Sequence, residues 1–192
     1  SAVRIAAENL KNDLKKVLGT EVTLGEFKGG ESILVGTAGV SAEIEGLFDE
    51  KKLQDKNGNF RKEAYIRTVS KDRLVIVGTD RRGTIYGIYD LCEEIGVSPW
   101  YFWADVPVKK KEWLVFPEDY EIIDYPSVEY RGIFINDEEE LERWAKLHME
   151  EDTIGVHTYE KIFELLLRLK ANYIWPAMHV NSFNRRKENG AL

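Results

Sequence analysis

The segment from residue 130 to residue 181 constrains the fold of this sequence most. It begins with the continuous apolar run IFI at residues 133–135, which predicts a short strand buried on both faces of a sheet. The run stops abruptly at Asn136 and Asp137. Two polar residues would therefore follow the carboxyl end of a buried strand, which is the end that carries active sites in a β/α barrel.

A helix and a second short strand follow this run. We predict a helix over residues 159–171, with Thr158 as its N-terminal cap and Asn172 as its end. Its buried face is formed by apolar residues at helical spacing, namely Tyr159, Ile162, Phe163, Leu166 and Leu169. Since a strand-helix-strand crossover joins parallel strands, Asp137 and Trp175 are expected close together at the carboxyl ends of adjacent parallel strands.

The first half of the chain mixes helical and strand patterns. Helices are predicted over residues 3–18, ended by Gly19, over residues 41–47, and over residues 84–95, ended by Gly96. Strands are predicted over residues 21–24 and 32–36, and a hairpin over residues 65–69 and 73–77. This alternation predicts a compact α/β domain with a mixed sheet that ends near Val97 or shortly beyond.

Residues 97–124 differ in composition from the segments on either side. They contain SPWYFWADVP, three lysines and then WLVFP, and this density of aromatic residues and prolines suggests an ordered segment that crosses between domains. Tyr125 and Pro126 mark the boundary. The predicted domains are residues 1–124, which include the crossing segment, and residues 125–192.

Charge, cysteine content and hydropathy argue against a nucleic-acid partner, an internal disulfide and a membrane-spanning segment. A formal net charge of -7, with residues 109–111 as a short basic run, argues against nucleic acid. The single cysteine, Cys92, cannot form an internal disulfide and is expected in the core. No apolar stretch is long enough to cross a membrane. The chain has no signal peptide and starts almost directly in a helical pattern, which suggests that a targeting segment has been removed.

The segment GTDRRGT at residues 78–84 has two interpretations. It follows a predicted strand and precedes a helix, and two arginines at a helix start can bind an anion. A phosphate-binding loop, however, has Lys and then Ser or Thr after its second glycine, whereas Thr84 follows Gly83 directly. The other interpretation is a tight turn in which Asp80 caps the helix.

The residues that follow the two strands are the candidate substrate-binding residues. Asn136 and Asp137 either cap the next helix or hydrogen-bond substrate hydroxyls at a barrel mouth. Trp175 either packs in the core or presents its ring to a sugar. His179 is either a hydrogen-bonding residue or a general acid or base, and Asn181 follows it.

Metal and cofactor chemistry are not expected. No group of His, Cys and carboxylate residues has the spacing of a metal site, and no Ser-His-Asp arrangement can be recognised from spacing. His148 and His157 lie in polar surroundings and are expected at the surface.

Four blocks of the sequence carry a resemblance to a known family. These are GTDRRGTIYGIYD at 78–90, GVSPWYFWADVPVKKK at 96–111, YRGIFIND at 130–137 and FELLLRLKANYIWPAM at 163–178. In these blocks the chain resembles family 115 of the glycoside hydrolases, the xylan α-1,2-glucuronidases. Many members of the family have Trp after the Pro-Ala-Met triplet, where this chain has His179, so the choice of substrate within the family stays open.

The resemblance implies an N-terminal mixed-sheet α/β domain followed by the first strand-helix-strand unit of a truncated (β/α)8 barrel. It implies removal of glucuronic acid, or its 4-O-methyl ether, from xylan oligosaccharides by an inverting route without a metal. Asp137 matches an acidic position after the first barrel strand, and Trp175 an aromatic after the second. The catalytic acid and base are expected beyond Leu192, so this chain alone is expected to be inactive. The resemblance also implies a periplasmic or extracellular location.

Two other classes of function remain open from the sequence. The chain could be a non-catalytic module that binds carbohydrate or a partner through aromatic residues between Trp100 and Trp113. It could also begin another barrel glycosidase with a hexosaminidase-like order of domains. The segment after Tyr125 is expected to rest on the N-terminal domain, on a missing remainder, or on a second copy of the chain in a homo-oligomer.

Overall fold

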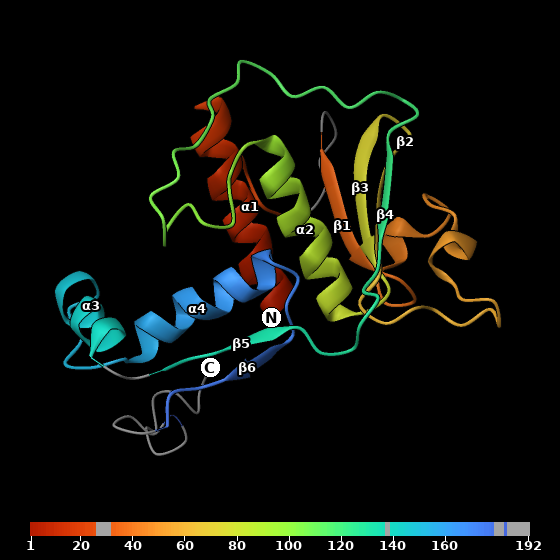
Figure 1. Ribbon diagram of the computed structural model, residues 1–192. Helices are drawn as coiled ribbons and strands as arrows, with labels where there is room; N and C mark the ends of the chain where they lie inside the picture. The colour runs from red at the N-terminus through yellow and green to blue at the C-terminus, as the bar shows by residue number, and fades with distance from the viewer. Residues whose placement is uncertain (26–31, 137–138, 179–182, 184–192) are drawn as a thin grey trace. The chain divides into compact units, whose positions relative to one another are not determined.

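The computed structural model describes residues 1–25, 32–136, 139–178 and 183, and the chain divides into two compact units (Figure 1). Unit 1 comprises Ser1–Ser127 and unit 2 comprises Val128–Leu192. The two units are described separately below.

Unit 1 is built on a four-stranded mixed sheet with the strand order β1-β3-β2-β4. Strand β1 (Ile33–Thr37) pairs in parallel with β3 (Arg73–Gly78). Strand β2 (Tyr65–Ser70) pairs antiparallel with β3 on one side and with β4 (Glu121–Asp124) on the other. The predicted mixed sheet and the predicted hairpin, which is β2–β3, are both confirmed.

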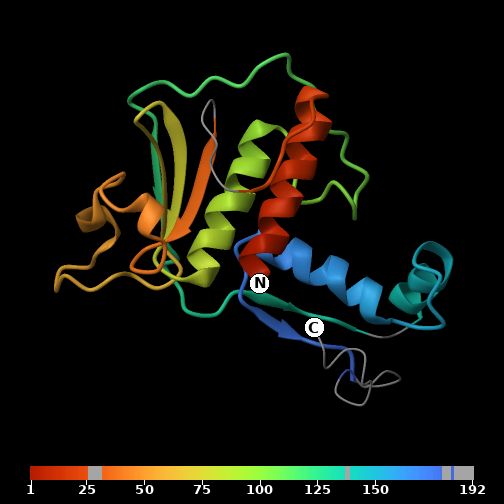
Figure 2. The same ribbon diagram turned by 180° about the vertical axis from the view of Figure 1, so that it is seen from behind.

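Two helices lie side by side on one face of this sheet (Figures 1 and 2). Helix α1 (Ala2–Leu18) ends at Gly19, whose φ of 72° is favourable for glycine. Helix α2 (Arg81–Ile95) ends at Gly96 and buries Cys92, as predicted. These two of the three helices predicted for unit 1 are therefore confirmed, although α2 begins at Arg81 rather than at Thr84 because Asp80 caps it.

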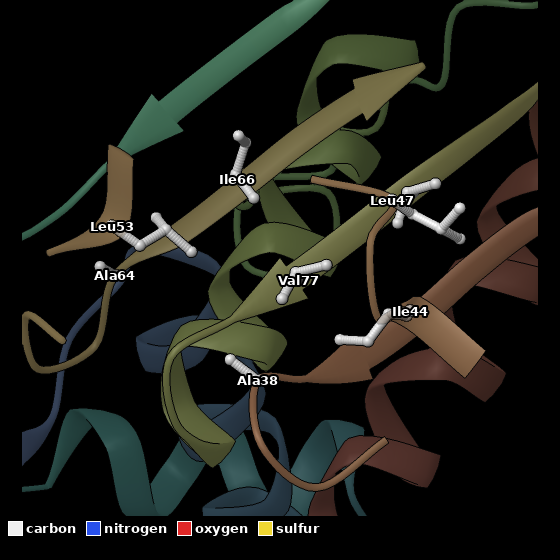
Figure 3. Close-up of a cluster of buried hydrophobic side chains, with 8 residues drawn as sticks. Ala38, Ile44, Leu47, Leu53, Ala64, Ile66 and Val77 are labelled. Atoms are coloured by element: carbon white, nitrogen blue, oxygen red, sulfur yellow. The ribbon is translucent and has the colours of Figure 1, made fainter. Parts of the chain in front are cut away.

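The opposite face of the sheet is covered by short 3₁₀ turns, η1 (Ala42–Ile44) and η2 (Glu50–Leu53). They close an apolar cluster over β2 and β3 (Figure 3), formed by Ala38, Ile44, Leu47, Leu53, Ala64, Ile66, Val75 and Val77. The predicted helix over residues 41–47 is reduced to η1. Ser41 takes the N-cap position without capping, because its hydroxyl accepts the Thr37 amide instead.

Two predictions for unit 1 are wrong. Residues 21–24 form no strand. The segment 97–124 is not only a connection, because its last residues form the edge strand β4. Glu121 and Asp124 give this strand a polar sequence with no apolar alternation to reveal it. Its place in the sheet comes from pairing with β2, which is distant in sequence.

Unit 2 contains β5 (Gly132–Phe134), α3 (Glu140–His148), α4 (Val156–Arg168) and β6 (Tyr173–Trp175). Strands β5 and β6 pair in parallel, as predicted. The expectation that residues 133–135 are buried on both faces is wrong for Ile133 and Phe134, which are 40% and 58% exposed, while Ile135 is buried. The described part of unit 2 supplies only two strands, and they pair edge to edge, so neither can cover a face of the other.

Helix α4 also differs from its prediction. It begins at Val156 and ends at Arg168, three residues earlier at each end than predicted. Thr158 is a buried residue inside the helix rather than its cap. Tyr159, Ile162 and Leu166 form the buried face as expected, whereas Leu169 lies past the helix end and is 41% exposed.

Candidate functional site

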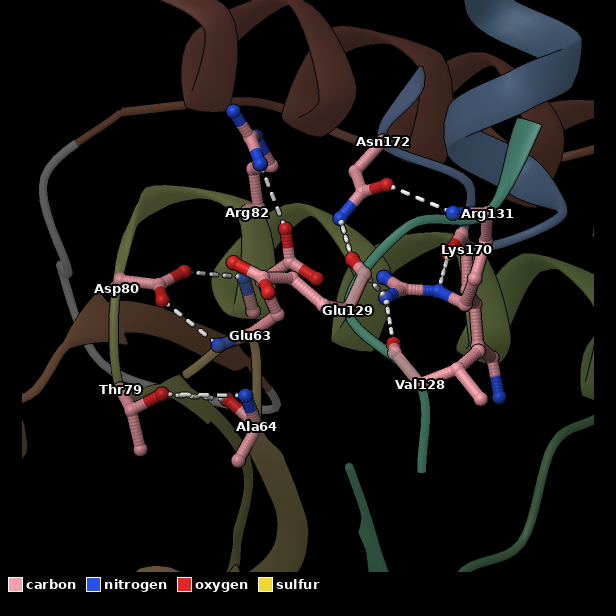
Figure 4. Close-up of polar contacts among 11 residues, drawn as sticks. Glu63, Ala64, Thr79, Asp80, Arg82, Val128, Glu129, Arg131, Lys170 and Asn172 are labelled. Atoms are coloured by element: carbon pink, nitrogen blue, oxygen red, sulfur yellow. Dashed lines mark hydrogen bonds and ion pairs between the residues drawn. The ribbon is translucent and has the colours of Figure 1, made fainter. Parts of the chain in front are cut away.

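The amino-terminal ends of β5 and β6 are joined by a network around Arg131 (Figure 4). The Arg131 Nε donates to the Lys170 carbonyl at 2.8 Å, and its Nη1 donates to the Val128 carbonyl at 2.8 Å. The Asn172 Oδ1 accepts the Arg131 amide, and the Asn172 Nδ2 donates to the Glu129 carbonyl. The prediction that Asn172 ends the helix is therefore wrong. Asn172 instead ties the start of β6 to the start of β5.

Close backbone contact between the two strands depends on Gly132. A Cβ at this position would lie 1.9 Å from the Tyr173 carbonyl oxygen, which a real side chain could not do. The register then places Phe134 opposite Trp175 at the carboxyl ends of the strands. A glycine at the start of β5 thus allows the pairing that brings the two carboxyl ends together.

The start of α4 is held by a carboxylate from outside the helix. The Glu151 side chain accepts the amides of Gly155, His157 and Thr158 and the Thr158 hydroxyl, at distances from 2.6 to 3.2 Å. Burial alone would raise the pKa of Glu151, but the bonds from Thr158 and the other amides outweigh it and lower this pKa. Glu151 therefore performs the capping that the sequence had suggested for Thr158, because N-cap Gly155 has no side chain.

Helix α4 is tied to the segment after β6. The buried Ala177 amide donates to the Tyr159 hydroxyl at 3.1 Å, and the Tyr159 ring also contacts the ring of Phe183. This bond orients the chain directly after Trp175, so the buried face of α4 helps to fix the carboxyl end of β6.

The carboxyl ends of β5 and β6 carry two of the predicted site residues. Trp175 is 51% exposed, and its ring meets that of Phe134 edge-on at a centroid distance of 6.2 Å. Asn136 is exposed after β5, where the Ile135 amide donates to the Trp175 carbonyl at 2.8 Å. Asn136 does not cap α3, because the N-cap position is Glu139. An exposed indole and a carboxamide at one sheet end offer a stacking surface and hydrogen-bonding groups.

The other three predicted site residues, Asp137, His179 and Asn181, lie outside the described residues. The predicted proximity of Asp137 to Trp175 therefore stays a prediction. His148 and His157 are exposed, as expected, with His148 stacked on Trp144 and His157 beside Glu160.

A buried charged group of unit 2 lies on α4, away from the strand ends. The Arg168 side chain is 2% exposed and donates to Glu164 at 2.9 Å, and Lys161 lies 3.0 Å from the same carboxylate. Burial would raise the pKa of Glu164, but Arg168 and Lys161 outweigh it and lower this pKa. The three residues are spaced like helix-stabilising ion pairs and serve the stability of α4.

In unit 1, the segment 78–84 is a tight turn rather than an anion site (Figure 4). The Asp80 carboxylate accepts the Gly83 amide at 2.8 Å and the Glu63 amide at 2.7 Å. A Cβ on Gly78 would lie 1.9 Å from the Thr84 nitrogen, and Arg82 pairs with Glu63 at 2.7 Å. An acidic side chain occupies the helix start, so the capping interpretation is confirmed.

The described residues contain no group of three or more His, Cys, Asp or Glu side chains arranged to hold a metal ion. Within the same part of the chain, no helix combines the length and apolar character needed to cross a membrane.

Family models and solved structures show what this chain is similar to. A model of glycosyl hydrolase family 115 matches residues 123–192, and a model of the glycosyl hydrolase family 67 N-terminus matches residues 1–91. No curated protein matches the chain. Among solved structures, it is similar to a family GH115 4-O-methyl-alpha-glucuronidase with specificity for decorated arabinogalactans, at 43% sequence identity and a TM-score of 0.87.

That similarity covers 97% of this chain and 25% of the solved structure's chain, so the chain spans about a quarter of its relative's length. The match extends over both units and agrees with the resemblance carried by the four sequence blocks. The chain therefore belongs to glycoside hydrolase family 115, of which it represents an N-terminal portion.

Proposed function

We propose that this chain is the N-terminal part of a glycoside hydrolase that removes α-1,2-linked glucuronic acid, or its 4-O-methyl ether, from a polysaccharide. The observation that carries the proposal is the 43% identity over 97% of the chain to a 4-O-methyl-alpha-glucuronidase of family 115. In this proposal unit 1 is an accessory α/β domain, and unit 2 begins the catalytic domain.

We further propose that β5, the helices after it and β6 are the first strand-helix-strand unit of a (β/α)8 barrel. The parallel pairing of β5 and β6 supports this, as does the exposure of Ile133 and Phe134. Barrel strands have neighbours on both sides and packed faces. The remaining strands would come from parts of the protein outside these 192 residues.

The carboxyl end of this strand pair is the proposed substrate site. The exposed Trp175 ring would stack on a sugar, and Asn136 would hydrogen-bond its hydroxyls. We assign the same role to Asp137, His179 and Asn181 from their sequence positions after the two strands. All five residues are proposed to bind and orient the glucuronic acid unit.

We propose an inverting reaction for the whole enzyme. Such a reaction needs a carboxylic acid and a carboxylate base separated by roughly 6.5–9.5 Å, with a water between base and sugar. Both groups are proposed to come from strand ends outside this chain, so the chain alone would be inactive. No metal is required for this chemistry. We also propose a periplasmic or extracellular location, because that is where an enzyme encounters polysaccharides.

The polysaccharide substrate can be identified by comparing two polysaccharides directly. The resemblance favours glucuronoxylan, whereas the solved relative is specific for decorated arabinogalactans. We expect the full-length enzyme to release glucuronic acid from one of these with a kcat/KM at least about tenfold higher than from the other. Release from neither would reject the proposed activity.

The role of the strand-end residues is tested by Asp137→Ala in the full-length enzyme. A hydrogen bond to a sugar hydroxyl that strengthens in the transition state contributes several kcal/mol, so turnover should fall strongly while the melting temperature stays the same. If Asp137 only caps a helix, activity should persist and stability should fall by about 1 kcal/mol. Asp152→Ala, at an exposed aspartate in the loop before α4, is a matched acidic control that should change neither by much.

A second candidate function is a carbohydrate-binding module in unit 1. The observation that favours it is the exposure of Trp100 and Trp113, at 45% and 68%. Titration of xylan and arabinogalactan oligosaccharides into the 192-residue chain separates the two proposals. Saturable binding lost in Trp113→Ala supports a module, whereas no binding and no release of glucuronic acid support the incomplete enzyme.

A further inference from the structure

The edge strand β4 is a weak element when judged by its backbone and its apolar contacts alone. It has four residues, and among the described strands it pairs only with β2. Its apolar residues are Ile122, which is 37% exposed, and Ile123, which packs at the margin of the cluster over β2 and β3. Short edge strands with little burial open readily, so other contacts must hold β4 in place.

Such contacts come from an ionic cluster between β2, α2 and β4. Arg67 of β2 is 2% exposed, and its guanidinium donates to Asp90 at 2.5 Å and to Glu94 at 2.7 Å. The Tyr120 hydroxyl, one residue before β4, donates to the same Glu94 oxygen at 2.7 Å. Arg67 also lies over the Tyr120 ring at 5.7 Å. A single buried arginine therefore links the helix to the beginning of β4.

The other end of β4 is held by a second member of this cluster. The buried Tyr65 hydroxyl donates to the Asp124 carboxylate at 3.3 Å. Burial, followed by the nearby Asp90 and Asp124 charges, raises the pKa of Tyr65, and burial with the bond to Glu94 raises that of Tyr120. Both phenols thus stay protonated and remain donors to carboxylates at any physiological pH.

The two faces of β4 are held by unlike contacts. On the face opposite the ionic cluster, Lys52 of η2 pairs with Glu121 at 2.7 Å, but both side chains are at least one-third exposed. Exposed ion pairs contribute little to stability. The Arg67–Asp90 pair differs, because the Arg67 side chain is 3% exposed and that of Asp90 17%, whereas Glu94 is 40% exposed. Removing the Arg67 charge leaves Asp90 largely shielded from water without its partner. The cluster on the α2 side is therefore the contact whose loss should release β4.

We propose that Arg67, Asp90, Glu94 and Tyr120, with the Tyr65–Asp124 bond, form a latch that fastens β4 to an otherwise self-sufficient unit 1. When the latch is open, β4 detaches while β1, β2, β3 and both helices stay folded. Since β4 ends at Asp124 and unit 1 ends at Ser127, an open latch lengthens the free connection that leads to unit 2.

Hydrogen exchange measured by mass spectrometry on the 192-residue chain tests the latch. In Arg67→Met, which keeps the side-chain volume but removes the charge, exchange over residues 119–126 should accelerate by at least about tenfold. Exchange in β1 and α1 should change by less than about twofold, because neither element contains a member of the latch or pairs with β4. Tyr120→Phe removes only one hydroxyl and should give the same local pattern with a smaller acceleration, of about threefold.

A matched control is Arg143→Met on α3, where an exposed arginine lies 3.9 and 4.0 Å from its acidic neighbours. It should leave exchange over residues 119–126 unchanged. Equal acceleration throughout unit 1 in both latch variants would overturn the proposal, because the cluster would then support the core and not β4 in particular. Unchanged exchange in both would overturn it as well. If Arg67→Met does not fold, Tyr120→Phe alone decides.

Discussion

Unit 1 and unit 2 both contain parallel strands and helices, but they differ in how completely the faces of their sheets are covered by other elements. The unit 1 sheet has helices α1 and α2 on one face and a closed apolar cluster on the other (Figures 1 and 3). In unit 2, the aromatic residues Tyr130, Phe134, Tyr173 and Trp175 are all about half exposed or more. Parallel strands are normally covered on both faces. Unit 1 therefore contains the partners its sheet needs, whereas the described part of unit 2 does not.

The largest expected effect comes from separating the two units. Residues 1–127 produced alone should unfold in one cooperative transition, within about 5 °C of the main transition of the intact chain. Residues 128–192 produced alone should melt at least about 10 °C lower and over a broader range, because a two-stranded sheet with one open face is at best marginally stable. Circular dichroism melts of the two pieces measure this, and a sharp melt of residues 128–192 at the temperature of residues 1–127 would contradict the comparison.

The next largest effect is expected at Gly78, where the chain turns from β3 towards α2. Because a Cβ there would lie 1.9 Å from a backbone nitrogen of α2, Gly78→Ala should destabilise unit 1 by about 3 kcal/mol or more. Urea denaturation followed by circular dichroism gives the free energy of unfolding. Gly39→Ala is no suitable control because its φ is positive, so Gly25→Ala is used: no atom of the described residues lies within 4 Å of the added Cβ, and the change should be small.

The equivalent substitution in unit 2 is Gly132→Ala at the start of β5. The added Cβ would lie 1.9 Å from the Tyr173 carbonyl oxygen, so the strand pair should be weakened by about 1–3 kcal/mol. Fluorescence of Trp175, in a chain whose other tryptophans are replaced by Phe, reports on this pair. We expect its transition to shift while the far-ultraviolet transition of unit 1 does not; a joint shift would mean that the units unfold together.

A smaller, pH-dependent effect is expected at Glu151. The pKa of Glu151 is lower in the folded chain than its ordinary value of 4.5 in the unfolded chain. Its stabilising effect is therefore complete above pH 4.5 and is lost as the pH falls through the lower, folded-state pKa. Glu151→Gln should cost unit 2 about 1 kcal/mol at pH 7, and the difference from the unchanged chain should shrink between about pH 5 and pH 3. Urea melts at several pH values measure this. A constant difference across this range would argue against a charged cap.

The smallest effect on stability is expected at Trp175. Because the side chain is half exposed, Trp175→Ala should change the free energy of unfolding of the chain by less than about 1 kcal/mol. The same substitution should raise the KM of the full-length enzyme if the ring stacks on a sugar. Leu147→Ala, at a strongly exposed apolar residue of α3, should change neither quantity. A large loss of stability at Trp175 would mean that the ring serves the core instead.

Local sequence patterns were sufficient wherever the structure depends on neighbours in the chain. Apolar spacing and glycine stops predicted α1 and α2, and the alternation of apolar and polar residues predicted the β2–β3 hairpin. The capping role of Asp80 was also readable, because its partner Gly83 lies only three residues away. The parallel pairing of β5 and β6 followed from the strand-helix-strand order.

Only the tertiary structure decided the features that depend on distant residues. Strand β4 exists because β2 and the Arg67 cluster hold it, and α4 begins early because Glu151 reaches its first amides. The exposure of Phe134 could not be predicted from an apolar run, since burial depends on which other strands and helices are present. Hydrophobic periodicity is a property of a segment, whereas burial and capping from outside a helix are properties of the packed chain.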